Sequence, residues 1–111
     1  MDACYKIVRK NLIISIGPEL DHHEANKLRQ ISDEQLRRSR ARNIILDFSV
    51  TDFMDSAGVG MIIGRYKEAN LRGGRVCVVN AGRPIRKLME ISGLYKLVYE
   101  YDSLDEALDN L

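Results

Sequence analysis

The chain has 111 residues, of which 45% are hydrophobic and 30% are charged, and its formal net charge is +1. These values suit one globular domain over residues 1–111, and a charge so close to zero gives no general attraction to nucleic acid or anionic membranes. The sequence has no apolar run near the roughly 20 residues that span a bilayer. It also has no leader with the basic and apolar regions of a signal peptide, so we expect a cytoplasmic protein.

The two cysteines, Cys4 and Cys77, are far apart and have no metal-ligand spacing. Cys77 lies in the apolar run 76–79, which predicts a small buried core residue. We therefore expect no metal site and no disulfide.

The first third of the chain predicts a β-hairpin followed by a helix. Residues 5–8 and 12–16 are apolar or alternate, as is typical of two short strands joined by a turn. Residues 17–20 interrupt this pattern, and Asp21 then opens a helix as its N-cap, with Glu24 three residues later. Apolar residues at helical spacing predict the buried stripe of this helix: Ala25, Leu28 and Ile31.

Two polar features of this first helix are better explained as solvated surface than as binding sites. The basic run 37–42 suits the last turn of a helix and lacks the interleaved aromatic residues of many nucleic-acid sites. His22 and His23 are adjacent, so on a helix they point about 100° apart and cannot easily share a metal or a substrate.

The central stretch is a buried strand, a turn and a second helix. The run 44–46 is short and apolar, and residues 47–55 form the turn that follows. Ser56 stands where this turn enters the helix, a place where serine accepts hydrogen bonds from the free amides of the first helical turn. The same amides and the helix dipole favour a phosphate there. We therefore expect Ser56 to be the N-cap and the centre of the function.

The helix after Ser56 has a core face and an unusual opposite face. Helical spacing assigns five residues to the core face: Val59, Ile62, Ile63, Tyr66 and Ala69. The opposite face carries small or apolar residues in place of charges: Ala57, Gly60, Met61, Gly64 and Leu71. A glycine inside a helix costs about 1 kcal/mol relative to alanine. Gly60 and Gly64 are therefore explained if a close surface lies there, either a partner protein or another element of this chain.

The remaining sequence alternates strands and helices. We expect a strand at 75–79, a helix with Pro84 at its first position, a strand at 97–99 and a last helix whose capping box is 103–106. The order β-β-α-β-α-β-α-β-α predicts an α/β fold with a mixed four- to five-stranded sheet and about four helices. If the strands before Asp21 and Ser56 are parallel neighbours, both loops lie at one edge of the molecule.

The motifs of nucleotide-binding proteins and hydrolases are absent from the sequence. There is no phosphate-binding loop, no dinucleotide fingerprint and no nucleophile elbow. We therefore predict no enzymatic activity and no cofactor.

Three segments resemble the signatures of one family. Residues 53–67, which contain Met-Asp-Ser-Ala-Gly, resemble the phosphorylation site of the bacterial anti-sigma factor antagonists, whose fold is the STAS fold. Residues 19–23, Glu-Leu-Asp-His-His, resemble a second signature, from the sporulation branch of the family, and residues 91–96 resemble a third. The resemblance covers nearly the whole chain.

This resemblance implies a switch. In the family, the unphosphorylated antagonist binds an anti-sigma factor that is also a serine kinase, which frees the sigma factor. Phosphorylation ends this binding, and a PP2C-type phosphatase restores it. Carried onto this chain, Ser56 is the phosphoacceptor and the free chain is a monomer. The implied docking surface comprises Asp21, Asp55, Ala57, Gly58, Gly60, Met61 and Gly64.

The chain departs from the family pattern at two positions. Pro18 stands where many members have glycine, and Ala57 stands where a sporulation relative has a second serine. The first departure bears on the shape of the loop before Asp21. The second leaves one candidate serine at the phosphorylation site.

Two other functions stay open. Within the family, the chain is alternatively an antagonist in a general stress pathway or a stressosome-type scaffold, although the pair His22-His23 argues against both. From another class, it is a small-ligand-binding or phosphocarrier domain with Ser56 as a transient acceptor. That function requires a pocket at the edge that Asp21 and Ser56 share.

Overall fold

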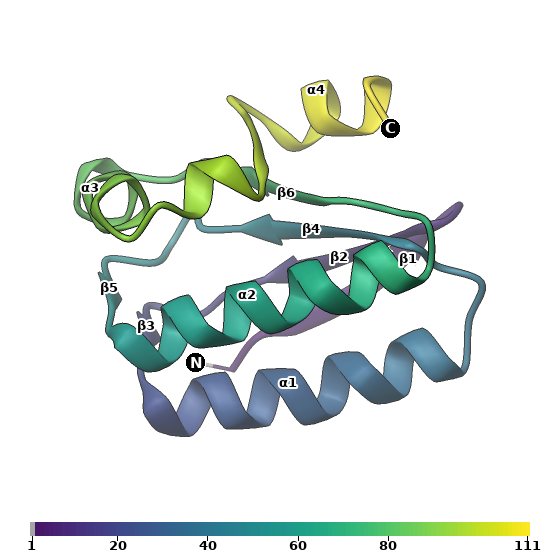
Figure 1. Ribbon diagram of the computed structural model, residues 1–111, viewed down its shortest axis with the longest axis horizontal. Helices are drawn as coiled ribbons and strands as arrows, with labels where there is room; N and C mark the ends of the chain where they lie inside the picture. The colour runs from purple at the N-terminus through teal and green to yellow at the C-terminus, as the bar shows by residue number, and fades with distance from the viewer. Residues whose placement is uncertain (1) are drawn as a thin grey trace.

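The apolar runs of the sequence form a five-stranded mixed sheet in the computed structural model, which describes residues 2–111 (Figure 1). The strand order is β1-β2-β4-β6-β7; β1 is antiparallel to β2, and the other neighbours are parallel. The bounds are β1 Cys4–Val8, β2 Asn11–Ser15, β4 Asn43–Asp47, β6 Val76–Val79 and β7 Tyr99–Tyr101. The predicted hairpin, mixed sheet and α/β class are confirmed.

Four α-helices and one short 3-10 helix cover the sheet. They are α1 His22–Arg37, α2 Ser56–Leu71, α3 Arg83–Ile91, α4 Leu104–Asp109 and the 3-10 helix η1 Leu94–Lys96. Figure 1 shows α1 and α2 side by side on one face, α4 on the other face, and α3 at the end where α2 begins. No helix within residues 2–111 has the length and apolar character needed to cross a membrane.

Alternation along the strands divides the core between the two faces. Ile44 and Leu46 of β4 belong to the larger cluster under α1 and α2, whereas Ile45 belongs to the smaller cluster with Cys77 and Ala107 of α4. Both faces are therefore covered, which explains why the central strands are continuous apolar runs. Cys77 is buried as predicted, and burial raises the pKa of its thiol to about 11.

The last strand starts two residues later than the sequence indicated. The expected strand was 97–99, but the chain first closes the short helix η1, where the amides of Leu97 and Val98 both donate to the Leu94 carbonyl. Pairing with β6 begins only at Tyr99, which lies opposite Cys77. The amides of Leu97 and Val98 are thus already hydrogen-bonded within this turn and do not pair with β6.

The buried stripe of α1 also differs from the prediction. Ala25 and Leu28 are buried, but the stripe continues through Ser32 and Leu36, and Ile31 is only partly covered. The reason is that α1 packs against α2 as well as the sheet. Ser32 accepts a hydrogen bond of 2.8 Å from the buried guanidinium of Arg65 in α2. Ser32 is therefore buried through a polar contact, which the spacing of apolar residues in the sequence does not predict.

A second, very short sheet forms where the sequence indicated only a break. Strand β3 is Glu19–Leu20 and strand β5 is Phe53–Met54, and the two are parallel. The Pro18 carbonyl accepts hydrogen bonds from the amides of Asp52 and Phe53 at 3.0 and 3.3 Å. Because proline keeps its carbonyl while lacking an amide, Pro18 suits this position. The two strands lead directly into α1 and α2, so the starts of both helices lie together.

We expect Gly58→Ala to destabilise the fold by about 1–3 kcal/mol, as overpacking of a core does. A β-carbon at this position would lie 2.5 Å from Met54 Cγ and 3.1 Å from Leu20 Cγ, so buried neighbours would have to move. The measurement is urea-induced unfolding followed by circular dichroism.

The matched control for this substitution is Gly60→Ala. A β-carbon at position 60 meets nothing within 4 Å, so alanine should leave stability unchanged or raise it by up to about 1 kcal/mol. Equal unfolding midpoints for the two variants would contradict the close packing at Gly58.

Candidate functional site

The starts of α1 and α2 form a pair of aspartate caps. Asp21 Oδ1 accepts the Glu24 amide at 2.9 Å, and Asp55 Oδ1 accepts the amides of Ala57 and Gly58 at 2.9 and 3.2 Å. The parallel pairing of β3 with β5 places these two caps side by side. The predictions that Asp21 caps a helix and that its loop adjoins the loop of Ser56 are confirmed.

The prediction that Ser56 is the N-cap of α2 is wrong. Asp55 is the cap, and Ser56 is the first residue of the helix, with an exposed side chain. An aspartate is as good a cap as a serine, and its negative charge is also favoured by the helix dipole. Since the carboxylate of Asp55 satisfies the first free amides, the hydroxyl of Ser56 is left facing solvent. That is the position a phosphoacceptor requires.

A flat ridge of α2 continues from Ser56. Ser56, Gly60 and Gly64 follow at intervals of four residues, so they lie on one side of the helix. A β-carbon built on either glycine meets nothing within 4 Å. The prediction of a smooth strip is therefore confirmed for these two glycines, and Ala57 flanks them half-buried.

Two residues assigned to this surface lie beneath it. Met61 is only 4% exposed and packs in the core, so its placement on the outward face is wrong. Gly58 is buried against Met54 and Leu20. Both differences arise because α2 is covered on two sides, by the sheet and by α1, which makes its buried face wider than one helical stripe.

A hollow of about 340 Å³ lies between the first turns of α1 and α2. Its lining comprises His22, Ala25, Asn26, Arg29, Ala57, Gly60 and Met61. His22 Nε2 lies 3.3 Å from Asn26 Nδ2, and the side chain of His23 is exposed. Within residues 2–111, no three His, Cys, Asp or Glu side chains are grouped so that they could hold a metal ion.

The edge next to Asp21 offers little to an anionic ligand. A hollow of about 220 Å³ there is lined by Pro18, Glu19, Asp21 and Glu24. Three of these four side chains are carboxylates, which repel a phosphate or a nucleotide. The pocket that the small-ligand alternative requires at the shared edge is therefore the hollow between α1 and α2, which His22 and Arg29 line, and not this acidic one.

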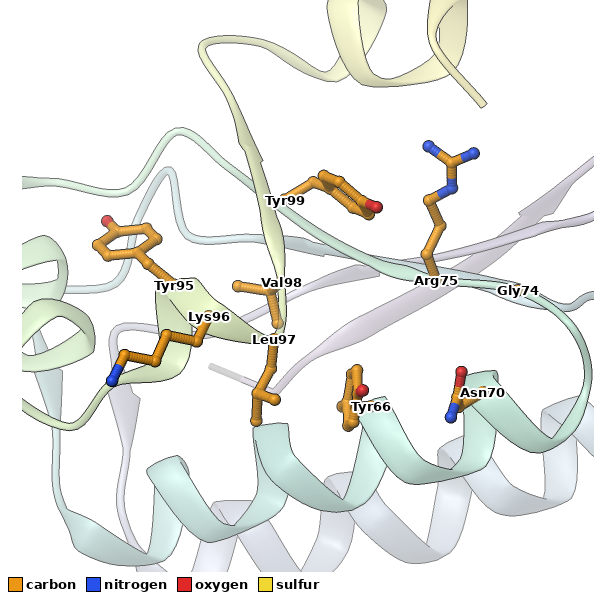
Figure 2. Close-up of a pocket in the computed structure, with 9 residues that line it drawn as sticks. All are labelled: Tyr66, Asn70, Gly74, Arg75, Tyr95, Lys96, Leu97, Val98 and Tyr99. Carbon is orange, nitrogen blue, oxygen red and sulfur yellow. The ribbon is translucent and has the colours of Figure 1, made fainter.

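A separate cavity of about 400 Å³ lies beside the C-terminal half of α2 (Figure 2). Tyr66 and Asn70 of α2 line one side, and the guanidinium of Arg75 lies 5.1 Å from the ring centroid of Tyr99 on the other. Tyr66 lies ten residues after Ser56, which is about 15 Å along a helix. This cavity is thus remote from the predicted phosphoacceptor.

Residues 5–107 match the family model described as STAS domain. The chain belongs to the STAS family. It is 39% identical to the anti-sigma F factor antagonist of Paenibacillus polymyxa, over 90% of this chain and 86% of that protein. The anti-sigma factor antagonists are a regulatory class and not a class of enzymes.

Solved structures agree with this assignment. The unphosphorylated anti-sigma factor antagonist SpoIIAA aligns with a TM-score of 0.87 and 29% identity, over 97% of this STAS domain and 94% of that chain. The Bacillus cell fate determinant SpoIIAA in its phosphorylated form aligns with a TM-score of 0.77 and 29% identity, over 97% of both chains. The predicted STAS fold is therefore confirmed.

We expect Asp55→Ala and Ser56→Ala to have different effects on stability. Loss of the Asp55 cap should lower the free energy of unfolding by about 1 kcal/mol, as the loss of an N-cap does. Ser56→Ala should change it by less than about 0.5 kcal/mol, since an exposed side chain outside the cap contributes little. Chemical denaturation of both variants measures this. If Ser56→Ala lowered the free energy of unfolding more than Asp55→Ala did, Ser56 and not Asp55 would be the N-cap.

Proposed function

We propose that this STAS domain is a phosphorylation-switched antagonist of an anti-sigma factor. In its unphosphorylated form it binds an anti-sigma factor that is also a serine kinase, and the sigma factor is released. Phosphorylation of Ser56 ends this binding, and a PP2C-type phosphatase restores it. The observation that carries the proposal is the exposed hydroxyl of Ser56 at the first position of α2, beside a cap that Asp55 already supplies.

The surface around Ser56 suits close approach of a partner in the unphosphorylated state. A β-carbon built on Gly60 or Gly64 would meet nothing within 4 Å, so a partner's backbone has room to approach this part of the ridge closely. Ala57 and the hollow between α1 and α2 continue this surface toward Asp21. We propose that Asp21, Asp55, Ala57, Gly60 and Gly64 contact the partner. Gly58 and Met61 support this surface from below.

The same geometry explains how phosphorylation would end binding. A phosphoserine carries about −1.5 to −2 charges near neutral pH. The amides of Ala57 and Gly58 already donate to the Asp55 carboxylate, so these two donors are not free to neutralise the phosphate. In a close-packed interface the phosphate would lose water beside the carboxylate of Asp55, a cost that the unmodified hydroxyl does not have. Each 1.4 kcal/mol of such cost weakens binding about tenfold.

We further propose that the regulated pathway is sporulation and that the protein acts in the cytoplasm as a monomer when free. The similarity to an anti-sigma F factor antagonist and the segment Glu19–His23 support this over a general stress pathway or a stressosome-type scaffold. A partner of this kind acts on transcription, which takes place in the cytoplasm. Neither nucleic acid nor membrane is a proposed partner.

We expect the cognate serine kinase and ATP to add one phosphoryl group to the wild-type chain and none to Ser56→Ala. Intact-mass spectrometry measures this, with Ser49→Ala, an exposed serine of the preceding loop, as a control that is still modified. The phosphorylated chain should bind the kinase at least about 100-fold more weakly, which corresponds to about 2.7 kcal/mol. Modification of Ser56→Ala would move the site elsewhere, and equal affinities would refute the switch.

A further inference from the structure

We propose that the anti-sigma factor partner also occupies an apolar groove between β5 and α3, which we call the β5–α3 groove. This inference rests on the proposed function and extends it to a second contact region. The groove has a volume of about 300 Å³, and the side chains that carry the argument are Phe53, Lys87, Leu88 and Ile91. The occupant we infer is a segment of that partner with apolar side chains and a carboxylate beside them.

The groove is flanked by two large apolar side chains that the fold does not cover. Phe53 is 47% exposed and Ile91 is 73% exposed, and they come from segments far apart in the sequence. In β5 the alternation of side chains turns Met54 into the core and Phe53 outward. A single exposed apolar residue is ordinary, but two around one apolar hollow are typical of a protein-binding surface.

The groove is continuous with the proposed phosphoacceptor region. Phe53 lies three residues before Ser56, and only Met54 and the cap Asp55 separate them. Figure 1 shows α3 at the same end of the molecule as β5 and the start of α2, and α3 contacts β5 directly. Phe53 and Ser56 are therefore near enough for one partner to contact both, and we infer that the kinase does so.

Charge at the rim defines the chemistry of the occupant. Lys87 lines the groove, and Arg83, Arg86 and the acidic Glu90 are exposed on the same helix around a neighbouring hollow, which leaves an excess of basic side chains on α3. Asp52 lies on the opposite rim, and Arg86 has Glu100 within 3.7 Å. The α3 side of the groove is thus positively charged, which favours a partner carboxylate next to Lys87 and apolar side chains against Phe53 and Leu88.

The test uses three variants of the full chain in titration calorimetry with the unphosphorylated protein and its kinase. Phe53→Ser should weaken binding about tenfold or more, as loss of a buried interface aromatic does. Ile91→Ser should weaken it about threefold to tenfold. Ile7→Ser is the control, because Ile7 is 39% exposed in the edge strand β1, away from the groove and from α2, and it should leave the affinity within about twofold of wild type.

Charge reversal provides a readout that loss of folding cannot imitate. Lys87→Glu should slow association at low salt, and the difference from wild type should shrink as salt screens the charges. Thermal unfolding by circular dichroism confirms that each variant is folded before it is titrated. A salt-independent affinity loss, or none, for folded Lys87→Glu would overturn the acidic character of the occupant.

The outcomes separate this inference from the function on which it rests. Wild type that binds the kinase while Phe53→Ser and Ile91→Ser bind equally well overturns the groove alone. Wild type that does not bind the kinase overturns the proposed function and, with it, the occupant inferred here. A second copy of this chain is the other candidate occupant: a wild-type dimer in sedimentation that Phe53→Ser converts to monomer would overturn our assignment.

Discussion

The parallel pairing of β3 with β5 is the constraint on which the functional end of this domain depends. Four residues in two strands fix the points at which α1 and α2 begin, and each strand is followed at once by a capping aspartate. The pairing is held from below, since Leu20 and Met54 turn into the core and leave room beside them only for the bare backbone of Gly58. The surface at Ser56 is therefore built on a core contact, and its shape depends on Gly58, which is buried beneath it.

A division of roles between Asp55 and Ser56 follows from this arrangement. Asp55 satisfies the amides that open α2, so the helix begins at the same place whatever happens to the hydroxyl beside it. A modification at Ser56 then changes the charge and bulk of the surface without removing a support of the fold. In contrast, a serine that capped its own helix would lose the cap when modified, and the regulated step would then also be a folding step.

The sequence predicted the elements whose periodicity is local and missed those that depend on packing between elements. Alternation and apolar runs were sufficient for the central strands, and residue preferences were sufficient for the cap at Asp21. The strands β3 and β5 could not be predicted, because two residues are too few to show an alternation of apolar and polar side chains. Their pairing also joins segments that are 34 residues apart in the sequence. The depth of Met61 and the buried Arg65 were also missed, since α2 packs on both the sheet and α1, and a helical stripe assumes one buried side. Arg65 donates to Ser32 and to Asp33 at 2.8 and 2.7 Å, a pairing across helices that no single helix reveals.

The packing of α2 also explains the glycines that follow Ser56, the proposed phosphoacceptor. The sheet covers one side of α2 and α1 covers another, and the ridge of Ser56, Gly60 and Gly64 lies on the side that neither covers. A helical side chain leans toward the N-terminus and covers the turn before its own. A larger residue at position 60 would therefore lie over Ser56 and hide the hydroxyl from a kinase. Gly60 thus weakens α2 by about 1 kcal/mol relative to alanine but keeps Ser56 uncovered, which the proposed function requires.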